Sequence, residues 1–232
     1  TYWVSEPDRG QSHAINKGFD LSSGDIMAWI NSDDYYAPNA FFKVALTFMQ
    51  SQSFWVAGIV HKVDAQGKVL HLGRKYIEKM EDWYVGSLYL QQGVFWRRKL
   101  WLSAGKIDET LQYSFDYDLL LRFVQQQSFA TWIDAHLANF RIHSDSKTSL
   151  AQLKFMQERK KIYKRYPTVG MGKKERINII LKRQERKSRI FMGMHGSRPA
   201  LELLARIFLA TPWYFFRPSF LYWIKVKLLS NR

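Results

Sequence analysis

Apolar and polar positions follow one another along the chain in a pattern that predicts helices and short buried strands in turn. Residues 10–24 place apolar side chains at helical spacing and end in Gly24, and the apolar run 25–30 reads as a strand. Alternating helices and buried strands predict an α/β sheet. The further elements expected are a helix at 40–50, two strands around the turn 65–67, a strand at 93–98, helices at 99–105 and 116–127, and strands at 129–133 and 136–143.

The predicted strand 25–30 ends in a polar group that includes Asn31, Asp33 and Asp34. Such residues often satisfy backbone groups in turns, so a turn alone would explain them. Ligands of open α/β sheets, however, bind beyond the carboxyl ends of strands. Carboxylates at that place suit Mg²⁺ or Mn²⁺, which bind substrate phosphates as well. The sequence therefore favours a substrate that carries a diphosphate.

Charge is distributed very unevenly along the 232 residues, which carry a net charge of +15. Residues 1–152 hold 15 Lys and Arg against 16 Asp and Glu, whereas residues 153–198 hold 15 against 3. We therefore expect a near-neutral domain at 1–150 and a basic, helical extension at 151–232. The chain has no cysteine, which excludes disulfides and thiolate metal sites.

The predicted extension also carries a C-terminal group of aromatic residues, including Trp213, Phe216 and Trp223. Charged residues and two prolines interrupt the segment, so a membrane-spanning helix is not expected. Basic and aromatic residues together favour peripheral binding to an anionic membrane surface, at its cytoplasmic face. The alternatives are a helical extension packed on the domain or on a partner, and binding to nucleic acid, which the aromatic residues disfavour.

The stretch SEPDRGQSHAINKGFDLSSGDIMAWINSDDYYAPNAF, residues 5–41, resembles the family 2 glycosyltransferases, which are inverting enzymes of the GT-A fold. The resemblance runs from about Ser5 to Ser149. It implies a GT-A-like, Rossmann-related mixed sheet flanked by helices. The family's first strands and their nucleotide-binding loop have no counterpart here, so we expect the chain to be N-terminally truncated relative to the family.

The resemblance also implies roles for individual residues around a metal and a nucleotide-diphosphate sugar. Asp33 matches the family's metal-binding carboxylate, and His143 matches the loop in which related enzymes place a third metal or diphosphate contact, although a lone histidine is more often structural. Mn²⁺ or Mg²⁺ is the expected cofactor. The residues expected to bind the donor are Asp8, Asn16, Lys17, Asn31, Asp34 and Arg141, with Ser146 and Lys147 as weaker candidates for the diphosphate.

A second group of carboxylates opens the predicted helix 116–127. An Asp at a helix start is commonly a cap, which would explain either Asp116 or Asp118, and Arg122 is spaced to pair with Asp118. An inverting transferase also needs a carboxylate that takes the proton of the acceptor hydroxyl. The resemblance points to Asp116 as this general base.

The segment 81–105 between these motifs is dense in aromatic residues, which are usually core but also stack on sugar rings. In the family this segment shapes the acceptor site. The residues expected to bind the acceptor are Trp83, Gln91, Gln92, Trp96 and Asp118.

Taken together, these features predict a glycosyltransferase that moves a sugar from a nucleotide-diphosphate donor to a saccharide or lipid-linked acceptor in cell-surface polysaccharide or lipopolysaccharide synthesis. The alternative is a catalytically silent relative that acts as a binding or membrane-associated scaffold. Metal-dependent binding of a nucleoside diphosphate would distinguish the two.

Overall fold

The computed structural model divides the chain into two compact units, Thr1–Pro167 and Thr168–Arg232. Residues 151–167 are thus grouped with the first unit, whereas the sequence predicted a division at residue 150. The aromatic C-terminal segment lies outside the described residues. The residues that the structure describes are 3–74, 80–85, 89–127, 129–143, 147, 151–166, 179–180 and 182–183.

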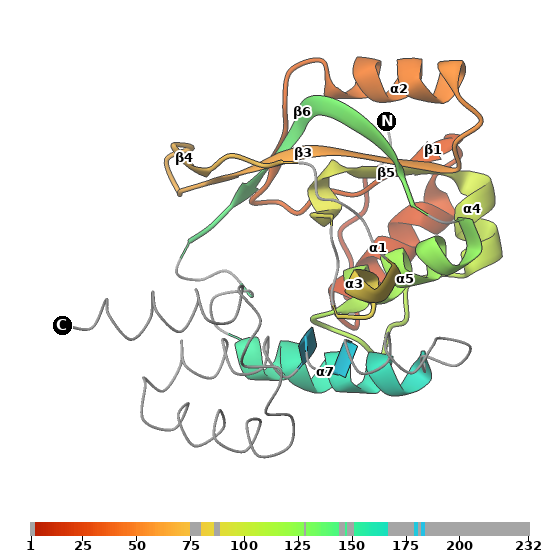
Figure 1. Ribbon diagram of the computed structural model, residues 1–232, viewed down its shortest axis with the longest axis vertical. Coiled ribbons are helices and arrows are strands. Elements are labelled where there is room, and N and C mark those ends of the chain that lie inside the picture. Colours follow the sequence, from red (N-terminus) through yellow and green to blue (C-terminus); the bar gives the residue numbers. More distant parts are fainter. Residues whose placement is uncertain are drawn as a thin grey trace. The chain divides into compact units, whose positions relative to one another are not determined.

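The described helices and strands of the first unit alternate much as the sequence predicted (Figure 1). In chain order they are α1 (Gln11–Leu21), β1 (Ile26–Met27), β2 (Tyr35–Tyr36), α2 (Ala40–Gln50), β3 (Trp55–Val63), β4 (Val69–His71), α3 (Met80–Trp83), the 3-10 turn η1 (Gln91–Gly93), β5 (Val94–Arg97), α4 (Arg98–Ala104), α5 (Phe115–Gln127), β6 (Thr131–Arg141) and α7 (Gln152–Arg165).

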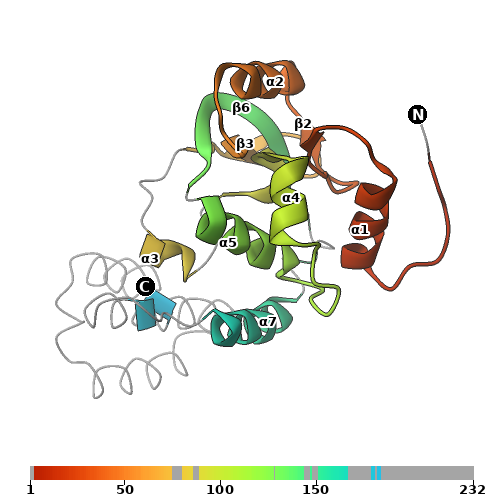
Figure 2. The same cartoon turned by 90° about the vertical axis from the view of Figure 1, so that its right-hand side faces the viewer.

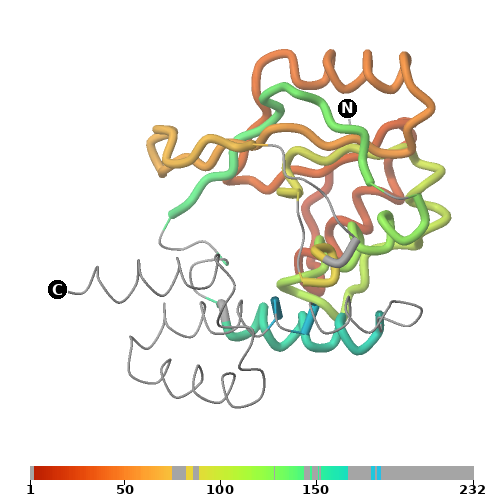
Figure 3. The backbone as a smooth tube through the Cα atoms, viewed as in Figure 1, coloured from red at the N-terminus to blue at the C-terminus, as the bar shows by residue number. Residues whose placement is uncertain are grey.

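The strands form one mixed sheet in the order β1-β5-β3-β6-β2, with β4 paired to β3. Among the described strands, only β3 and β6 run parallel, with Val56 opposite Thr131 and Val63 opposite Arg141, and the other pairs are antiparallel. Although β3 and β6 are far apart in the sequence, the tube in Figure 3 shows them side by side in orange and green. The mixed α/β sheet with flanking helices confirms the predicted fold class at this level.

Helices cover both faces of the sheet (Figures 1 and 2). On one face, α2 buries Ala40, Val44 and Phe48, which lie at i, i+4 and i+8 and pack against Val56, Phe95 and Leu137 of the strands. The other face is covered by α1, α4 and α5 around a larger core that is rich in aromatic rings. The unit is therefore layered as helix, sheet and helix, with the sheet buried between two cores.

Three local features differ from the sequence prediction. The strand expected at 25–30 is reduced to Ile26–Met27, because the residues that follow it turn toward the polar group at Asn31. The strands expected at 129–133 and 136–143 form one continuous strand, β6. A short strand, β2, was not predicted, and its two tyrosines pair with the end of β6.

Helix α4 ends at Ala104 and is followed by Gly105, whose φ of 82° only glycine adopts readily. The exposed carbonyl groups at this end accept hydrogen bonds from Arg122 of α5, which donates to Ala104, Gly105 and Lys106. Within the described residues, no helix is long and apolar enough to cross a membrane.

Candidate active site

Asp34 is the centre of the polar group at the end of β1. Its side chain is 8% exposed and accepts hydrogen bonds from Asn31 Nδ2 at 3.0 Å, Gln92 Nε2 at 2.7 Å and the backbone N–H of Arg141 at 2.8 Å. Burial raises the pKa of Asp34 above its ordinary value, although the Gln92, Arg141 and Asn31 hydrogen bonds act in the opposite direction. With both oxygens engaged, Asp34 fastens the end of β1 to the end of β6.

Asp33 and His143 approach one another beside this anchor. The distance from His143 Nε2 to Asp33 Oδ2 is 3.1 Å, and the two side chains are 29% and 35% exposed, respectively. Asp33 comes from the turn that Asp34 fixes, and His143 follows the end of β6 directly. The structure thus brings together the two residues that the sequence named as metal ligands.

A carboxylate oxygen suits either Mn²⁺ or Mg²⁺, whereas an imidazole nitrogen beside it favours Mn²⁺ over Mg²⁺, which prefers oxygen ligands. The described residues contain no group of three or more His, Asp or Glu side chains that could enclose an ion. A cation held by only two protein ligands keeps positions for water and for the phosphate oxygens of a substrate. The donor set therefore fits a metal that is shared with a diphosphate.

A chain of polar contacts leads from Asn31 to the segment that precedes α5. Gln11, at the start of α1, donates from Nε2 to Asn31 Oδ1 at 2.7 Å and accepts from Lys147 Nζ at 3.0 Å. The same Lys147 ammonium lies 5.8 Å from the ring centre of Tyr113. Gln11 was not anticipated from the sequence, where it looked only like the first residue of a helix.

Asp116 lies in the first turn of α5, and its side chain is partly buried. The neighbouring Phe115 packs its ring 6.1 Å from that of Trp29, which follows β1, so α5 begins near the strand end that carries the polar group. Burial raises the pKa of Asp116, while the positive charge of Arg159 lowers it. A carboxyl with a raised pKa near a proposed substrate site has the properties of a general base.

Several residues expected at the donor are used elsewhere in the described structure. Asn16 is buried and binds the backbone of Ile107 through both its amide nitrogen and its oxygen, so it joins α1 to the loop after α4. Lys17 pairs with Glu6. Asp8 accepts from Gly10 N at 2.7 Å in the turn before α1. These contacts give the three residues structural tasks.

Arg141 contributes to the site by its backbone rather than by its side chain. Its N–H binds Asp34, but its guanidinium donates to the carbonyl of Ala65 at 2.9 Å and lies 5.5 Å from the ring centre of Tyr35. The side chain is thus directed to the turn between β3 and β4. Ser146, the other candidate from this loop, lies outside the described residues.

The aromatic residues expected at the acceptor are core residues. Trp83 and Trp96 are 0% exposed and pack among other rings, so neither presents a face on which a sugar could stack. Gln91 donates to Trp29 O at 2.6 Å and Gln92 to Asp34, which makes both of them supports of the strand-end group. We leave the two tryptophans out of the proposed acceptor site.

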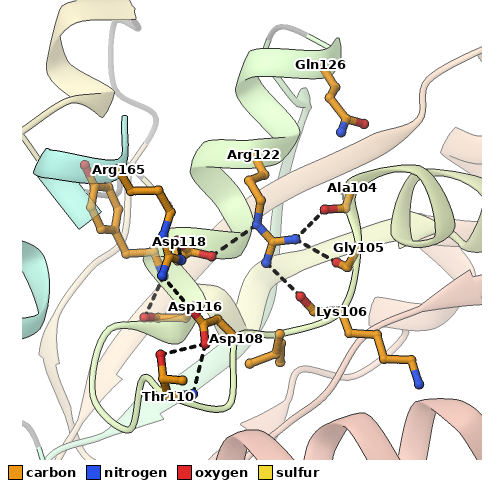
Figure 4. A network of polar contacts seen from close by, with 12 residues as sticks. Ala104, Gly105, Lys106, Asp108, Thr110, Asp116, Asp118, Arg122, Gln126 and Arg165 are labelled. Carbon is orange, nitrogen blue, oxygen red and sulfur yellow. Dashed lines mark hydrogen bonds and ion pairs between the residues drawn. The ribbon is translucent and has the colours of Figure 1, made fainter. Parts of the chain in front are cut away.

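Asp118 is also a structural residue, as Figure 4 shows. Its carboxylate is 1% exposed and lies between Arg122 Nε at 3.1 Å and Arg165 Nη1 at 3.0 Å. Arg165 binds Asp108 as well, at 2.6 Å. The predicted pairing of Asp118 with Arg122 is present, and it explains one of the two carboxylates of α5 without a substrate.

Part of the chain matches a known family of proteins. Residues 2–105 match the family Glycosyl transferase family 2. The fold is similar to that of S. aureus TarS 1–349 in complex with UDP-GlcNAc, with a TM-score of 0.56 and 12% identity over 86% of this chain and 60% of that one. It is also similar to a structure of S. aureus TarS, with a TM-score of 0.50 and 10% identity over 82% of this chain and 34% of that one.

This chain thus spans 60% or less of the length of these two structures. No curated protein gives a match. The resemblance predicted from residues 5–41 is thus found over residues 2–105, which are less than half of the chain.

Proposed function

We propose that this protein transfers a sugar from a nucleotide-diphosphate donor to a saccharide or lipid-linked acceptor, with inversion at the anomeric carbon, because residues 2–105 match the family Glycosyl transferase family 2. The observation that carries the proposal is the 3.1 Å approach of His143 to Asp33 at the end of β1, where a diphosphate-bound cation would sit. The start of α5 near the same strand end supplies the second catalytic group, Asp116.

Asp33 and His143 are the residues that would hold Mn²⁺ or Mg²⁺. When bound, the ion would stabilise the negative charge that develops on the leaving diphosphate. Asn31, Asp34 and Gln92 hold the Asp33 turn in place through their hydrogen bonds, which leaves Asp33 free to face the ion and the substrate. The different roles of these adjacent carboxylates explain why Asp34 is buried and Asp33 is partly exposed.

Asp116 in its ionised form accepts the proton of the acceptor hydroxyl. As that proton leaves, the hydroxyl oxygen forms a bond to the anomeric carbon from the face opposite the diphosphate, and the bond from the carbon to the diphosphate oxygen breaks. The products are the extended acceptor, the nucleoside diphosphate and a protonated Asp116. One displacement of this kind inverts the configuration at the anomeric carbon.

Uridine is the first base to test, because TarS 1–349, whose fold is similar, was solved with UDP-GlcNAc. Calorimetric titration of UDP and of GDP into the protein, each with and without Mn²⁺, is the direct experiment. We expect UDP to bind with a Kd of about 1 μM–1 mM, the usual range for substrates, and only when Mn²⁺ is present. Equal binding without the ion would remove the proposed role of Asp33 and His143.

Absence of nucleotide binding under every condition would instead favour the second function, a catalytically silent scaffold. GDP bound in preference to UDP would keep the transferase and change only the donor. The titration therefore separates the reaction class from the donor's base.

We further propose that the acceptor belongs to cell-surface polysaccharide or lipopolysaccharide synthesis and that the basic residues of 153–198 bring the protein to the cytoplasmic face of the membrane. The support is the excess of 15 Lys and Arg over 3 Asp and Glu in that segment. Co-sedimentation with vesicles of anionic lipid should exceed both co-sedimentation with neutral vesicles and binding to RNA in the same buffer. Tighter binding to RNA would contradict the proposal.

A further inference from the structure

Helix α7 lies outside the residues that match the family, yet it packs within the first unit next to the start of α5. Ile162 is fully buried in the same core as α5, and Tyr163 donates from its hydroxyl to Val85 O at 2.6 Å. The rings of Tyr163 and Tyr117 lie 6.4 Å apart. One side of α7 is therefore in contact with the helix that carries Asp116.

Glu158 of α7 binds the segment that leads into α5. Its carboxylate is 8% exposed and accepts three consecutive backbone N–H groups, from Gln112 at 2.7 Å and from Tyr113 and Ser114 at 2.8 Å. Backbone N–H groups just before a helix have no partner within the helix and need an acceptor from elsewhere. Glu158 is that acceptor, and hydrogen bonds to an ionised carboxylate are among the stronger ones in proteins.

Other contacts between α7 and this segment act at the same point. The hydroxyl of Ser114 is directed to Phe155 O, at 3.4 Å, while its carbonyl accepts the Asp118 N–H of the first turn at 3.1 Å. Arg165 bridges Asp108 and Asp118, which lie before and after the segment (Figure 4). The position of the first turn of α5 thus depends on α7.

Arg159, the neighbour of Glu158, is the cationic group of α7 that acts on Asp116. Its guanidinium lies 4.4 Å from the ring centre of Tyr117, the residue next to Asp116. Its Nη1 atom is enclosed and has no hydrogen-bond partner in the described structure. The positive charge of Arg159 lowers the pKa of Asp116, against the larger effect of burial and the smaller one of Glu158.

We propose that Glu158 and Arg159 are positioning residues for the transfer reaction. Glu158 fixes the segment that leads into the first turn of α5, which carries Asp116, and Arg159 places a positive charge beside that turn. The proposal rests on the proposed function for the catalytic role of Asp116. The contacts of α7 themselves do not depend on it. If the role of Glu158 and Arg159 were purely structural, variants of these residues would lower the stability of the fold. They would not specifically change the titration of Asp116 or kcat.

The charge of Arg159 is tested by NMR titration of the carboxyl carbons of labelled aspartates, with Asp116→Asn used to assign the signal. We expect Arg159→Gln to move the titration of Asp116 to higher pH and Arg159→Lys to leave it nearer that of the unaltered protein. The control is Lys160→Gln, which removes the same charge from an exposed neighbour and should not move the signal. Equal titration in Arg159→Gln and Lys160→Gln would overturn this half of the proposal.

The clamp of Glu158 is tested by the rate of UDP release from UDP-GlcNAc in the presence of Mn²⁺, with water as acceptor. In Glu158→Gln an amide NH₂ group replaces a carboxylate oxygen that accepted a hydrogen bond from a backbone N–H. Two donors would then face one another, so the segment before α5 must shift. We expect kcat to fall about tenfold or more with KM unchanged, since small displacements of a reacting group cost up to ~100-fold. The exposed neighbour Gln157→Ala should leave both constants unchanged.

An increase in KM with kcat unchanged would overturn the role of Glu158, because it would place the effect in donor binding. Absence of UDP release from the unaltered protein would exclude UDP-GlcNAc as the donor, and together with absence of UDP and GDP binding it would refute the proposed function. The NMR titration needs no turnover and still decides the effect of Arg159 on Asp116. The failures of the two proposals can therefore be told apart.

Discussion

Asp116→Asn should lower kcat for sugar transfer by about 10²–10⁴-fold, the usual contribution of a positioned general base, while donor binding is retained. The amide has nearly the shape of the carboxylate but cannot accept the proton of the acceptor hydroxyl. The same dependence should appear in the unaltered enzyme as a loss of kcat/KM on acidification. Because burial raises the pKa of Asp116, this loss should set in at higher pH than it would for an exposed aspartate.

The same substitution should make the fold more stable at neutral pH. The pKa of Asp116 is raised in the folded protein above its ordinary value of 3.8, so folding disfavours the ionised carboxylate. Ionisation of Asp116 therefore lowers the free energy of unfolding. This loss of stability is absent below the pKa of the unfolded state and appears as the pH rises through the pKa of the folded state. Thermal unfolding at neutral pH should therefore show a higher Tm for Asp116→Asn, by about 2–4 °C for each ~1 kcal/mol, and the gain should vanish in acid.

Asp134→Asn is a suitable control, because Asp134 is an exposed carboxylate of β6. It should change neither kcat nor the dependence of Tm on pH. If Asp116→Asn kept full activity, the base would have to be sought elsewhere in the site. A lower Tm for this variant at neutral pH would show that the carboxylate stabilises the fold instead of costing stability.

Asp33→Asn and His143→Ala should each weaken Mn²⁺-dependent binding of UDP by about 100-fold or more. Loss of a residue that only supports a metal ligand already costs 10–100-fold in affinity, and loss of a ligand should cost at least as much. Titration of Mn²⁺ followed by electron paramagnetic resonance, with UDP present, measures the affinity for the ion directly. Both variants should keep the Tm of the unaltered protein, because both side chains are partly exposed.

Asp25→Asn and His71→Ala are the matched controls, since both residues are exposed and lie away from the Asp33 turn along the chain. Each should bind UDP and Mn²⁺ as the unaltered protein does. Unchanged binding in Asp33→Asn would show that the ion is held by other groups, and the pairing with His143 would then be a simple hydrogen bond.

The alternation of elements and the mixed sheet could be predicted from the sequence because apolar periodicity is a local property. The continuity of β6 could not, because a polar residue, Asp134, interrupts its apolar pattern on the exposed side of the strand. The strand β2 has only two residues and owes its existence to pairing with β6, which no local pattern records. The basic charge of α7 led to its assignment to an extension. Charge alone did not reveal that Ile162 and Glu158, on one side of this helix, are buried.

Asp33 and His143 are far apart in the sequence and were both predicted to bind the metal. In the structure they lie together. The donor role of Asn16 stays a prediction, because a buried amide that binds backbone groups and one that binds a ligand look the same in a sequence. Sequence alone likewise does not distinguish a tryptophan of the core from one that stacks on a sugar ring. Trp83 and Trp96 are fully buried and therefore belong to the core. One local signal was available for Glu158: it is a single acid within the basic run 154–165.

The parallel pairing of β3 with β6 has a consequence for how the chain folds. Residue 56 cannot find its partner until residue 131 is available, whereas the antiparallel pair of β3 and β4 forms between near neighbours. Contacts between distant residues close large loops and slow folding, so the β3 and β4 hairpin should form early and the sheet centre late. During synthesis, the turn with Asp33 would emerge long before β6, and the candidate active site would be assembled only after His143 had left the ribosome.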